Sequence, residues 1–182
     1  MNNGLVSYEG LLALVANGTI SCVEPSSING CSINVTLQDR FLVEDNRGSR
    51  ALSFANRESP PFYEVRGGVC VPPGGFVLGA LKEKVTLPDN LACTFYLRSS
   101  AARMGINHSL AMFADPGYSG HLTLEITNVL RHHPILLRGG DQIGQLLFWH
   151  VDPVPQGNCY ASTGAKYSQD NGPQPVKPEH GA

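Results

Sequence analysis

The chain has 182 residues, of which 42% are hydrophobic, and a formal net charge of -2 at pH 7. This length and composition fit a single domain with a full core. The lack of a basic excess argues against general nucleic-acid binding, because no surplus of Lys and Arg neutralises phosphates. The apolar runs are short and interrupted, and residues 1–4 do not resemble a signal-peptide start, so we expect a cytoplasmic protein without a membrane partner.

The first expected element is a helix over residues 8–16. Ser7 precedes it as a candidate N-cap, and Gly18 follows it as a stop signal. The apolar face of this helix is formed by Leu11, Leu12 and Val15. We expect it to be the only substantial helix of the chain.

Short apolar segments then alternate with clusters of Gly, Pro and Asn. They read SINVTLQ, RFLVED, GGVCVPP, FVLGALKEKVTL, CTFYLRS, GHLTLEITNV, HPILLRG and IGQLLFWHV. Many short strands with regular turns predict an all-β barrel or sandwich. Residues 46–61 have no such pattern and predict a loop, whereas PPGG, LPDN and RGGD predict hairpin turns. No linker divides the series, so residues 1–182 are expected to form one domain.

The five cysteines indicate a protein without a zinc site. They stand at positions 22, 31, 70, 93 and 159, so no C-x-x-C motif occurs and the signature of the zinc-dependent deaminases is missing. We expect small unpaired thiols.

A polar cluster, RSSAAR, interrupts the apolar pattern at residues 98–103. Arg98, Ser99, Ser100 and Arg103 offer two guanidinium groups and two hydroxyls, which suit the oxygens of a phosphorylated ligand. The same residues also fit a short capped helix whose arginines are solvated. The local sequence leaves both interpretations open.

The next polar feature is a strand that follows a tight turn. The sequence DPGYSG at residues 115–120 predicts the turn, and HLTLEIT after it alternates as a strand does. Leu122, Leu124 and Ile126 would share one face, and Thr123 and Glu125 the other. Glu125 would then lie on a polar face, where it could meet the basic cluster.

The ordered motifs RSSAARMG, HSLAMFADPGYSG, LTLE and IGQL together resemble the dCTP deaminase family, relatives of the trimeric dUTPases. The resemblance runs from about Ser32 to Gly172, most of the chain. It implies a distorted β-barrel or jelly-roll-like fold of the dUTPase type, with a short N-terminal helix and a C-terminal lid. It also implies a homotrimer with sites between subunits.

The activity that the resemblance implies is metal-independent deamination of dCTP at C4 to dUTP and ammonia. Glu125 would shuttle the protons, and Arg103 would limit the rise in its pKa that burial causes. Ser99 and the backbone carbonyl of Ala111 would position the attacking water. Replacing Glu125 should abolish ammonia release.

The resemblance also implies the residues that bind the nucleotide. Asp115 would contact the sugar 3′-hydroxyl, while Thr123 and Leu124 would offer backbone contacts to the base. The phosphates would be held by Arg98, Ser99, Ser100 and Lys166, with Mg²⁺ bound mainly through the triphosphate itself. Residues 155–182 are rich in Pro, Gly, Ser and Asn and predict a flexible arm, from which Tyr160 and Lys166 would close over the ligand.

Two features favour a bifunctional enzyme that continues from dUTP to dUMP and pyrophosphate: Gln145, and the HSLAMF run before the aspartate. A dUTPase without deaminase activity and a non-catalytic nucleotide-binding trimer stay as alternatives. Asn34 replaces an acidic residue of the family's first motif, and Asp170 stands where the family has Gln. Gln169 could supply the missing amide through a shift of one residue. The bulk of Leu110 and Met112 raises the question of a modified pyrimidine.

Overall fold

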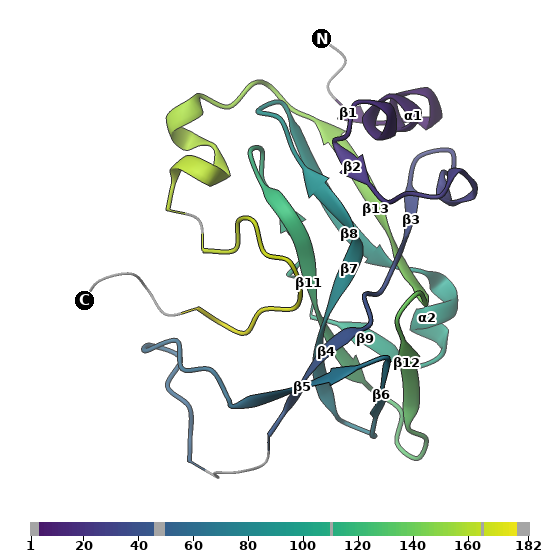
Figure 1. Ribbon diagram of the computed structural model, residues 1–182, viewed down its shortest axis with the longest axis vertical. Coiled ribbons are helices and arrows are strands. Elements are labelled where there is room, and N and C mark those ends of the chain that lie inside the picture. The colour runs from purple at the N-terminus through teal and green to yellow at the C-terminus, as the bar shows by residue number, and fades with distance from the viewer. Residues whose placement is uncertain (1–3, 46–49, 110, 165, 178–182) are drawn as a thin grey trace.

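The computed structural model describes residues 4–45, 50–109, 111–164 and 166–177 (Figure 1). The helices are α1 (Tyr8–Ala16) and α2 (Ser99–Arg103), with short 3-10 turns η1 (Pro25–Ser27), η2 (Gln156–Asn158) and η3 (Tyr160–Ser162). The strands are β1 (Gly4–Leu5), β2 (Ile20–Ser21), β3 (Ile33–Thr36), β4 (Arg40–Glu44), β5 (Phe62–Arg66), β6 (Gly68–Val71), β7 (Phe76–Thr86), β8 (Leu91–Leu97), β9 (Ile106–His108), β10 (Phe113–Ala114), β11 (Ser119–Asn128), β12 (Ile135–Arg138) and β13 (Gln142–His150). The prediction of an all-β chain with one substantial helix is confirmed.

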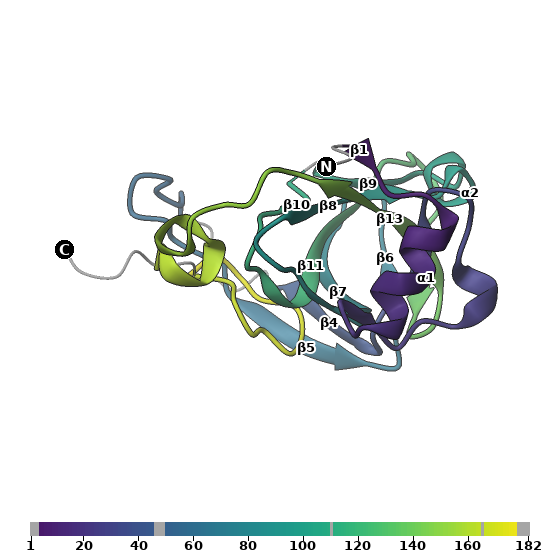
Figure 2. The ribbon, with the colours of Figure 1, turned by 90° about the horizontal axis from the view of Figure 1, so that it is seen from above.

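The strands form two large antiparallel sheets and a two-stranded ribbon. The five-stranded sheet has the order β1-β13-β8-β10, with β3 also paired to β13. The six-stranded sheet has the order β5-β4-β7-β11-β9, with β2 also paired to β7. Strands β6 and β12 make the ribbon. Seen from above, the sheets curve around a shared interior (Figure 2), where Phe41, Leu81, Leu124 and Phe148 are fully buried.

The predicted turns are present, but they do not make hairpins. The turn at residues 72–75 leads from the ribbon into the six-stranded sheet, and the turn at residues 87–90 leads from there into the five-stranded sheet. The turn at residues 138–141 likewise joins β12 of the ribbon to β13 of the five-stranded sheet. Turn residues fix a local change of direction, whereas distant strands decide the pairing. This repeated change of sheet gives the fold its jelly-roll-like character.

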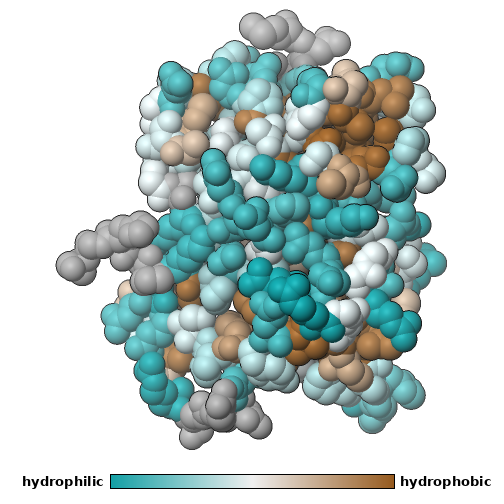
Figure 3. All heavy atoms as spheres, in the orientation of Figure 1, coloured by the Kyte–Doolittle hydropathy of each residue, from teal (hydrophilic) through white to brown (hydrophobic). Residues whose placement is uncertain are grey.

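Helix α1 has the predicted bounds, and its burial differs in detail from the expected face. Ser7 is the N-cap and Gly18 follows with a φ of 80°. Leu11 and Leu14 are buried, while Leu12 is 37% exposed. Leu12 therefore belongs to the surface and not to the core, because the helix buries a narrower stripe than its apolar content suggests. Hydrophobic side chains gather on the surface over this helix (Figure 3).

The remaining local predictions agree with the part of the chain that the structure describes. Residues 50–61 contain no strand or helix, while residues 46–49 of the predicted loop lie outside the described residues. All five cysteines are free thiols, and burial raises the pKa of Cys93 to about 12. Among the described helices, none is long and apolar enough to cross a membrane.

Candidate active site

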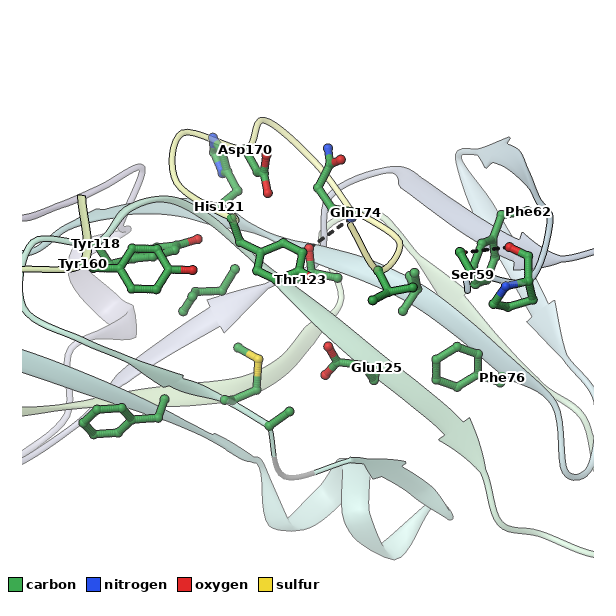
Figure 4. A pocket seen from close by; sticks show the side chains of 18 residues that line it. Ser59, Phe62, Phe76, Tyr118, His121, Thr123, Glu125, Tyr160, Asp170 and Gln174 are labelled. Carbon is green, nitrogen blue, oxygen red and sulfur yellow. Dashed lines mark hydrogen bonds between the residues drawn. The ribbon is translucent and has the colours of Figure 1, made fainter. Parts of the chain in front are cut away.

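A cavity of about 520 Å³ opens beside β11. Strands β11, β7 and β5 form one side, residues 111–113 form another, and the C-terminal segment closes it. Side chains from distant parts of the chain point into this space (Figure 4). Its size is within the usual range for a small-molecule site.

Glu125 is the carboxylate nearest the middle of this cavity (Figure 4). The even-numbered residues of β11 are buried and the odd-numbered ones are partly exposed, as the sequence predicts, so Glu125 faces away from the core. Its Oε2 atom is buried and has no hydrogen-bond partner among the described residues. Burial raises the pKa of Glu125, and its own backbone N–H partly offsets that rise. Such a carboxylate is a stronger base than an exposed one.

Two tyrosines and a histidine lie at one end of the cavity. The rings of Tyr118 and Tyr160 meet edge to face with centroids 5.5 Å apart. The Nδ1 atom of His121 lies 3.0 Å from the carbonyl oxygen of Leu81. Burial raises the pKa of the Tyr118 phenol, and the Asp170 carboxylate adds to that rise. This end of the cavity is therefore polar and aromatic.

The C-terminal segment is docked along β11. The N–H of Gln169 donates to the carbonyl of Ser119, and the N–H of His121 donates to the carbonyl of Asp170 at 3.0 Å. Further along, the N–H of Gln174 donates to the Thr123 hydroxyl at 3.1 Å. These bonds cover an edge of β11 that would otherwise be open. The flexibility expected of this arm stays a prediction, since the structure records its docked position.

Lys177, the last described residue of the C-terminal arm, holds the arm in place through contacts with other residues of the arm. Its Nζ donates to Asp170 Oδ1 at 2.7 Å and to the carbonyl of Lys166 at 2.8 Å. It also lies 5.3 Å from the centre of the Tyr167 ring. Asp170, the acid that departs from the family pattern, is thus neutralised within the arm itself.

Four of the predicted site residues line the cavity: Ala111, Thr123, Glu125 and Tyr160. Leu124 is fully buried in the core, although its backbone belongs to the strand that forms the wall. Asp115 begins the turn that supports this end, and the N–H of Tyr118 donates to its carbonyl at 3.1 Å. In the same region the carbonyl of Pro116 accepts from the N–H of Tyr160 at 2.9 Å.

The predicted phosphate-binding residues are not among those that line the cavity. Arg98 caps α2, and Ser99, Ser100 and Arg103 lie on this helix, which packs beside β9. Arg98 donates to the side chain of Gln142. The expected effect of Arg103 on the Glu125 pKa does not arise within one chain. Helix α2 agrees with the interpretation as a short helix, and the phosphate-binding role of its polar groups stays a prediction.

Three further predicted residues also lie outside the cavity wall. Gln145 accepts a hydrogen bond from the Ser32 hydroxyl at 3.0 Å and lies opposite Asn34 in the β13–β3 ladder. Gln169 has a φ of 64°, its side chain is exposed, and Asp170 lines the cavity in its place. With the left-handed backbone at Gln169, the side chain of Asp170 faces the cavity and that of Gln169 faces solvent. Lys166 contributes its carbonyl to Lys177, and Leu110 lies outside the described residues.

The described side chains do not form a magnesium site of their own. No three His, Cys, Asp or Glu residues in the described part of the chain converge on a point that could hold a metal ion. Mg²⁺ favours phosphate oxygens together with one or two carboxylates. Binding of Mg²⁺ through a triphosphate stays a prediction.

Known protein sequences resemble most of this chain. Residues 6–151 match the family described as dCTP deaminase-like. The chain belongs to the dCTP deaminase-like family. A protein of Nocardia farcinica named "dCTP deaminase, dUMP-forming" is 40% identical over 182 residues, covering 95% of this chain and 90% of the relative. A protein of the same name from Mycobacterium avium is 38% identical, with 95% of each chain covered.

A solved structure supports the fold of this dCTP deaminase-like chain. The 2′-deoxycytidine 5′-triphosphate deaminase from Agrobacterium tumefaciens superposes with a TM-score of 0.65 at 21% identity. The match covers 82% of this chain and 49% of the Agrobacterium protein, so the chain spans about half the length of that structure. At this level of identity, the similarity establishes a common architecture and no more.

Sequence reasoning missed one end of the cavity of this dCTP deaminase-like protein. Pro60, Phe62, Phe76, Leu78 and Val176 form an apolar wall, and none of them belongs to a recognised motif. Leu78 lies opposite Glu125 in the β11–β7 ladder, and Phe76 opposite Thr127. Only the pairing of distant strands brings these residues together, so no local pattern could have identified them.

Proposed function

We propose that this protein deaminates dCTP at C4 and carries the product on to dUMP and pyrophosphate. The observation that carries the proposal is Glu125, a cavity carboxylate whose Oε2 has no hydrogen-bond partner among the described residues and whose pKa burial raises. The names of the Nocardia and Mycobacterium relatives support both the substrate and the product. A free nucleotide as substrate fits a cytoplasmic enzyme.

The chemistry requires water to attack C4 and the 4-amino group to leave. In the proposed mechanism Glu125 takes a proton from the water, then passes protons to N3 and to the departing amine. A raised pKa suits both steps, because the group must accept a proton and return it near neutral pH. The carbonyl of Ala111 lies in the cavity wall and would accept a hydrogen bond from the water.

The remaining groups would come from a second subunit. We infer that α2 of a neighbouring copy brings Ser99 and Arg103 to Glu125, and Arg98 and Ser100 to the phosphates. A homotrimer with shared sites accounts for the absence of these side chains from the cavity wall within one chain. Mg²⁺ would enter as part of the triphosphate substrate. Tyr160 and Lys166 of the arm and Asp115 of the turn would complete the site.

One assay tests the proposal and its alternatives. The protein is incubated with Mg²⁺ and either dCTP or dUTP, and ammonia, pyrophosphate and the nucleotide product are measured. Ammonia and dUMP from dCTP are the expected result. Ammonia with dUTP as the only product would limit the function to deamination. Pyrophosphate from dUTP without ammonia from dCTP would indicate a dUTPase, and no turnover would indicate a binding protein.

Glu125→Gln supplies the mechanistic arm of this test. We expect ammonia release to fall by at least about a thousandfold, because the amide neither accepts nor returns a proton. Nucleotide binding and the oligomeric state should stay close to those of the wild type. Glu9→Gln, on the exposed side of α1, is the matched control and should keep full activity.

A further inference from the structure

The two ends of the cavity differ in chemistry, and Glu125 lies between them (Figure 4). Tyr118, Tyr160, His121 and Asp170 gather at one end (Figure 4). Phe62 and Phe76 lie at the other end, next to Pro60, Leu78 and Val176. The one hydroxyl in this apolar wall, that of Ser59, lies 2.9 Å from the carbonyl of Pro60 and can donate to it. The apolar end therefore offers mainly contacts for hydrocarbon.

The position of Glu125 fixes how a cytosine nucleotide would lie between these ends. His121 and Glu125 are four residues apart on one face of β11, about 13 Å along the strand. A nucleotide can bridge that span, with its sugar and phosphates at the polar end and C4 at the carboxylate. In a pyrimidine, C4 is opposite N1, which carries the sugar. The bond from C4 to the exocyclic nitrogen therefore continues along the cavity, towards Phe76 and Leu78.

Unsubstituted cytosine would leave this space unused. Its 4-amino group is small and polar, and ammonia needs no apolar wall in order to leave. An alkyl group on the same nitrogen would contact Phe76, Leu78 and Val176. Each buried methylene favours binding by about fourfold, which corresponds to about 0.8 kcal/mol. The apolar end is thus complementary to a substituent on the leaving amine.

We propose that the cavity also accepts deoxycytidine triphosphates with a small alkyl group on the 4-amino nitrogen, and that the enzyme releases this group as an alkylamine. The inference rests on the proposed deamination and extends its substrate class. The water oxygen forms a bond to C4, and the bond between C4 and the amine nitrogen breaks. Of the two protons of the water, one goes to N3 and the other leaves with the alkylamine. The uracil nucleotide is the same product that dCTP gives.

The test compares dCTP, N4-methyl-dCTP and 5-methyl-dCTP as substrates of the full-length protein. Uracil nucleotide, ammonia and methylamine are measured separately. We expect N4-methyl-dCTP to yield methylamine with a kcat/KM within about tenfold of that for dCTP. Phe76→Trp, which fills the apolar end, should lower the ratio of the two kcat/KM values by at least about tenfold. Phe76→Ala, which enlarges the apolar end, should raise the kcat/KM for N4-propyl-dCTP relative to that for dCTP. Tyr63→Ala, an exposed aromatic of β5 outside the cavity, is the matched control and should leave the ratio unchanged.

The outcomes separate this inference from the proposed function. Failure with dCTP itself would overturn the deaminase proposal. Ammonia from dCTP without methylamine from N4-methyl-dCTP would overturn the inference alone, and so would binding of the alkylated nucleotide without turnover. If 5-methyl-dCTP and not N4-methyl-dCTP responded to the Phe76 variants, the apolar end would lie beside C5, which also contradicts the inference. If a Phe76 variant fails to fold, the comparison of dCTP with N4-methyl-dCTP as substrates of the wild-type protein still tests the inference.

Discussion

Glu125 lies directly opposite Leu78 across the β11–β7 ladder, so an ionisable carboxyl shares a sheet face with a buried aliphatic side chain. This neighbour cannot donate a hydrogen bond, and Oε2 is buried without a partner among the described residues. Burial therefore raises the pKa of Glu125. The arrangement favours the neutral form of the acid in the folded state, which is unfavourable for stability at neutral pH but useful for proton transfer.

The first prediction concerns the stability of Glu125→Gln. A carboxyl whose pKa is raised by folding contributes stability below its ordinary pKa, and this contribution is lost as the pH rises through the folded value. Gln imitates the neutral form at every pH. We expect the variant to be more stable than the wild type at pH 8 by about 1 kcal/mol, or about 2–4 °C in Tm. The difference should disappear as the pH falls below about 4.5.

Thermal melts at several pH values measure this effect, with Glu9→Gln as the control that should follow the wild type throughout. A variant that is less stable at pH 8 would mean that the ionised carboxylate is well paired in the assembled protein. In that case the contact proposed between Glu125 and Arg103 of the neighbouring subunit stabilises the carboxylate by more than its burial costs.

The alternation of β11 and the bounds of α1 could be predicted from the sequence, because each depends on residues that are neighbours along the chain. The period of two places Glu125 away from the core, and the Ser7 and Gly18 signals delimit the helix. Strand pairing, by contrast, depends on contacts between residues far apart in the chain. For this reason the prediction of hairpins was wrong, and the apolar wall that contains Phe76 was missed. The docking of Asp170 instead of Gln169 depends on one left-handed residue in an irregular segment.

The second prediction tests whether sites are shared between subunits. Arg103 lies on α2 and is absent from the cavity wall within one chain. Arg103→Ala and Glu125→Gln should each be inactive when alone. When the two variants are refolded together, a site with both groups intact forms where one chain supplies the carboxylate and its neighbour the guanidinium. Random assembly gives about one quarter of the wild-type activity.

Native mass spectrometry would verify that mixed trimers form, because the two variant chains differ in mass, and the deaminase assay would measure the recovery. Refolding each variant with itself is the control and should give no activity. Inactive mixtures that nevertheless contain both chains would show that Arg103 and Glu125 must belong to the same subunit.

The third prediction concerns the fastening of the C-terminal arm. Lys177 bonds to the Asp170 carboxylate and to the Lys166 carbonyl, and it lies against the Tyr167 ring. Lys177→Met keeps the length of the side chain and removes its charge. If the substitution lowers the free energy that favours the docked arm by about 1 kcal/mol, the open form of the arm becomes about fivefold more populated. We expect proteolysis of the arm to be faster by about this factor. The KM for dCTP should rise by less, because it follows the fraction of the closed form, and kcat should change little.

Asp170→Asn is the matched second change, because an amide needs no cation. Added to Lys177→Met, it should restore part of the protease resistance, and a double-mutant cycle measures the coupling between the two side chains. Additive effects would mean that Lys177 acts through Lys166 or Tyr167 alone.

The fourth prediction concerns Glu83, a second buried acid far from the proposed chemistry. Its carboxylate accepts hydrogen bonds from the N–H of Thr36 at 3.0 Å and from the Thr36 hydroxyl at 2.9 Å, and so joins β7 to β3. Burial raises the pKa of Glu83, although both bonds from Thr36 oppose the rise. Thr36→Val removes the hydroxyl and should destabilise the fold by about 1–3 kcal/mol.

The sign of the pH effect distinguishes this mechanism from simple loss of packing. Without the hydroxyl, the pKa of Glu83 rises further, so the penalty should be largest above the folded pKa, where the carboxylate is ionised. It should shrink as the pH falls and the acid becomes neutral. Urea denaturation at pH 5 and pH 8 measures the difference. Combining Thr36→Val with Glu83→Gln should remove most of the pH dependence, because the buried group then no longer ionises. A penalty that is equal at both pH values would mean that the hydroxyl acts through its volume and not through the carboxylate.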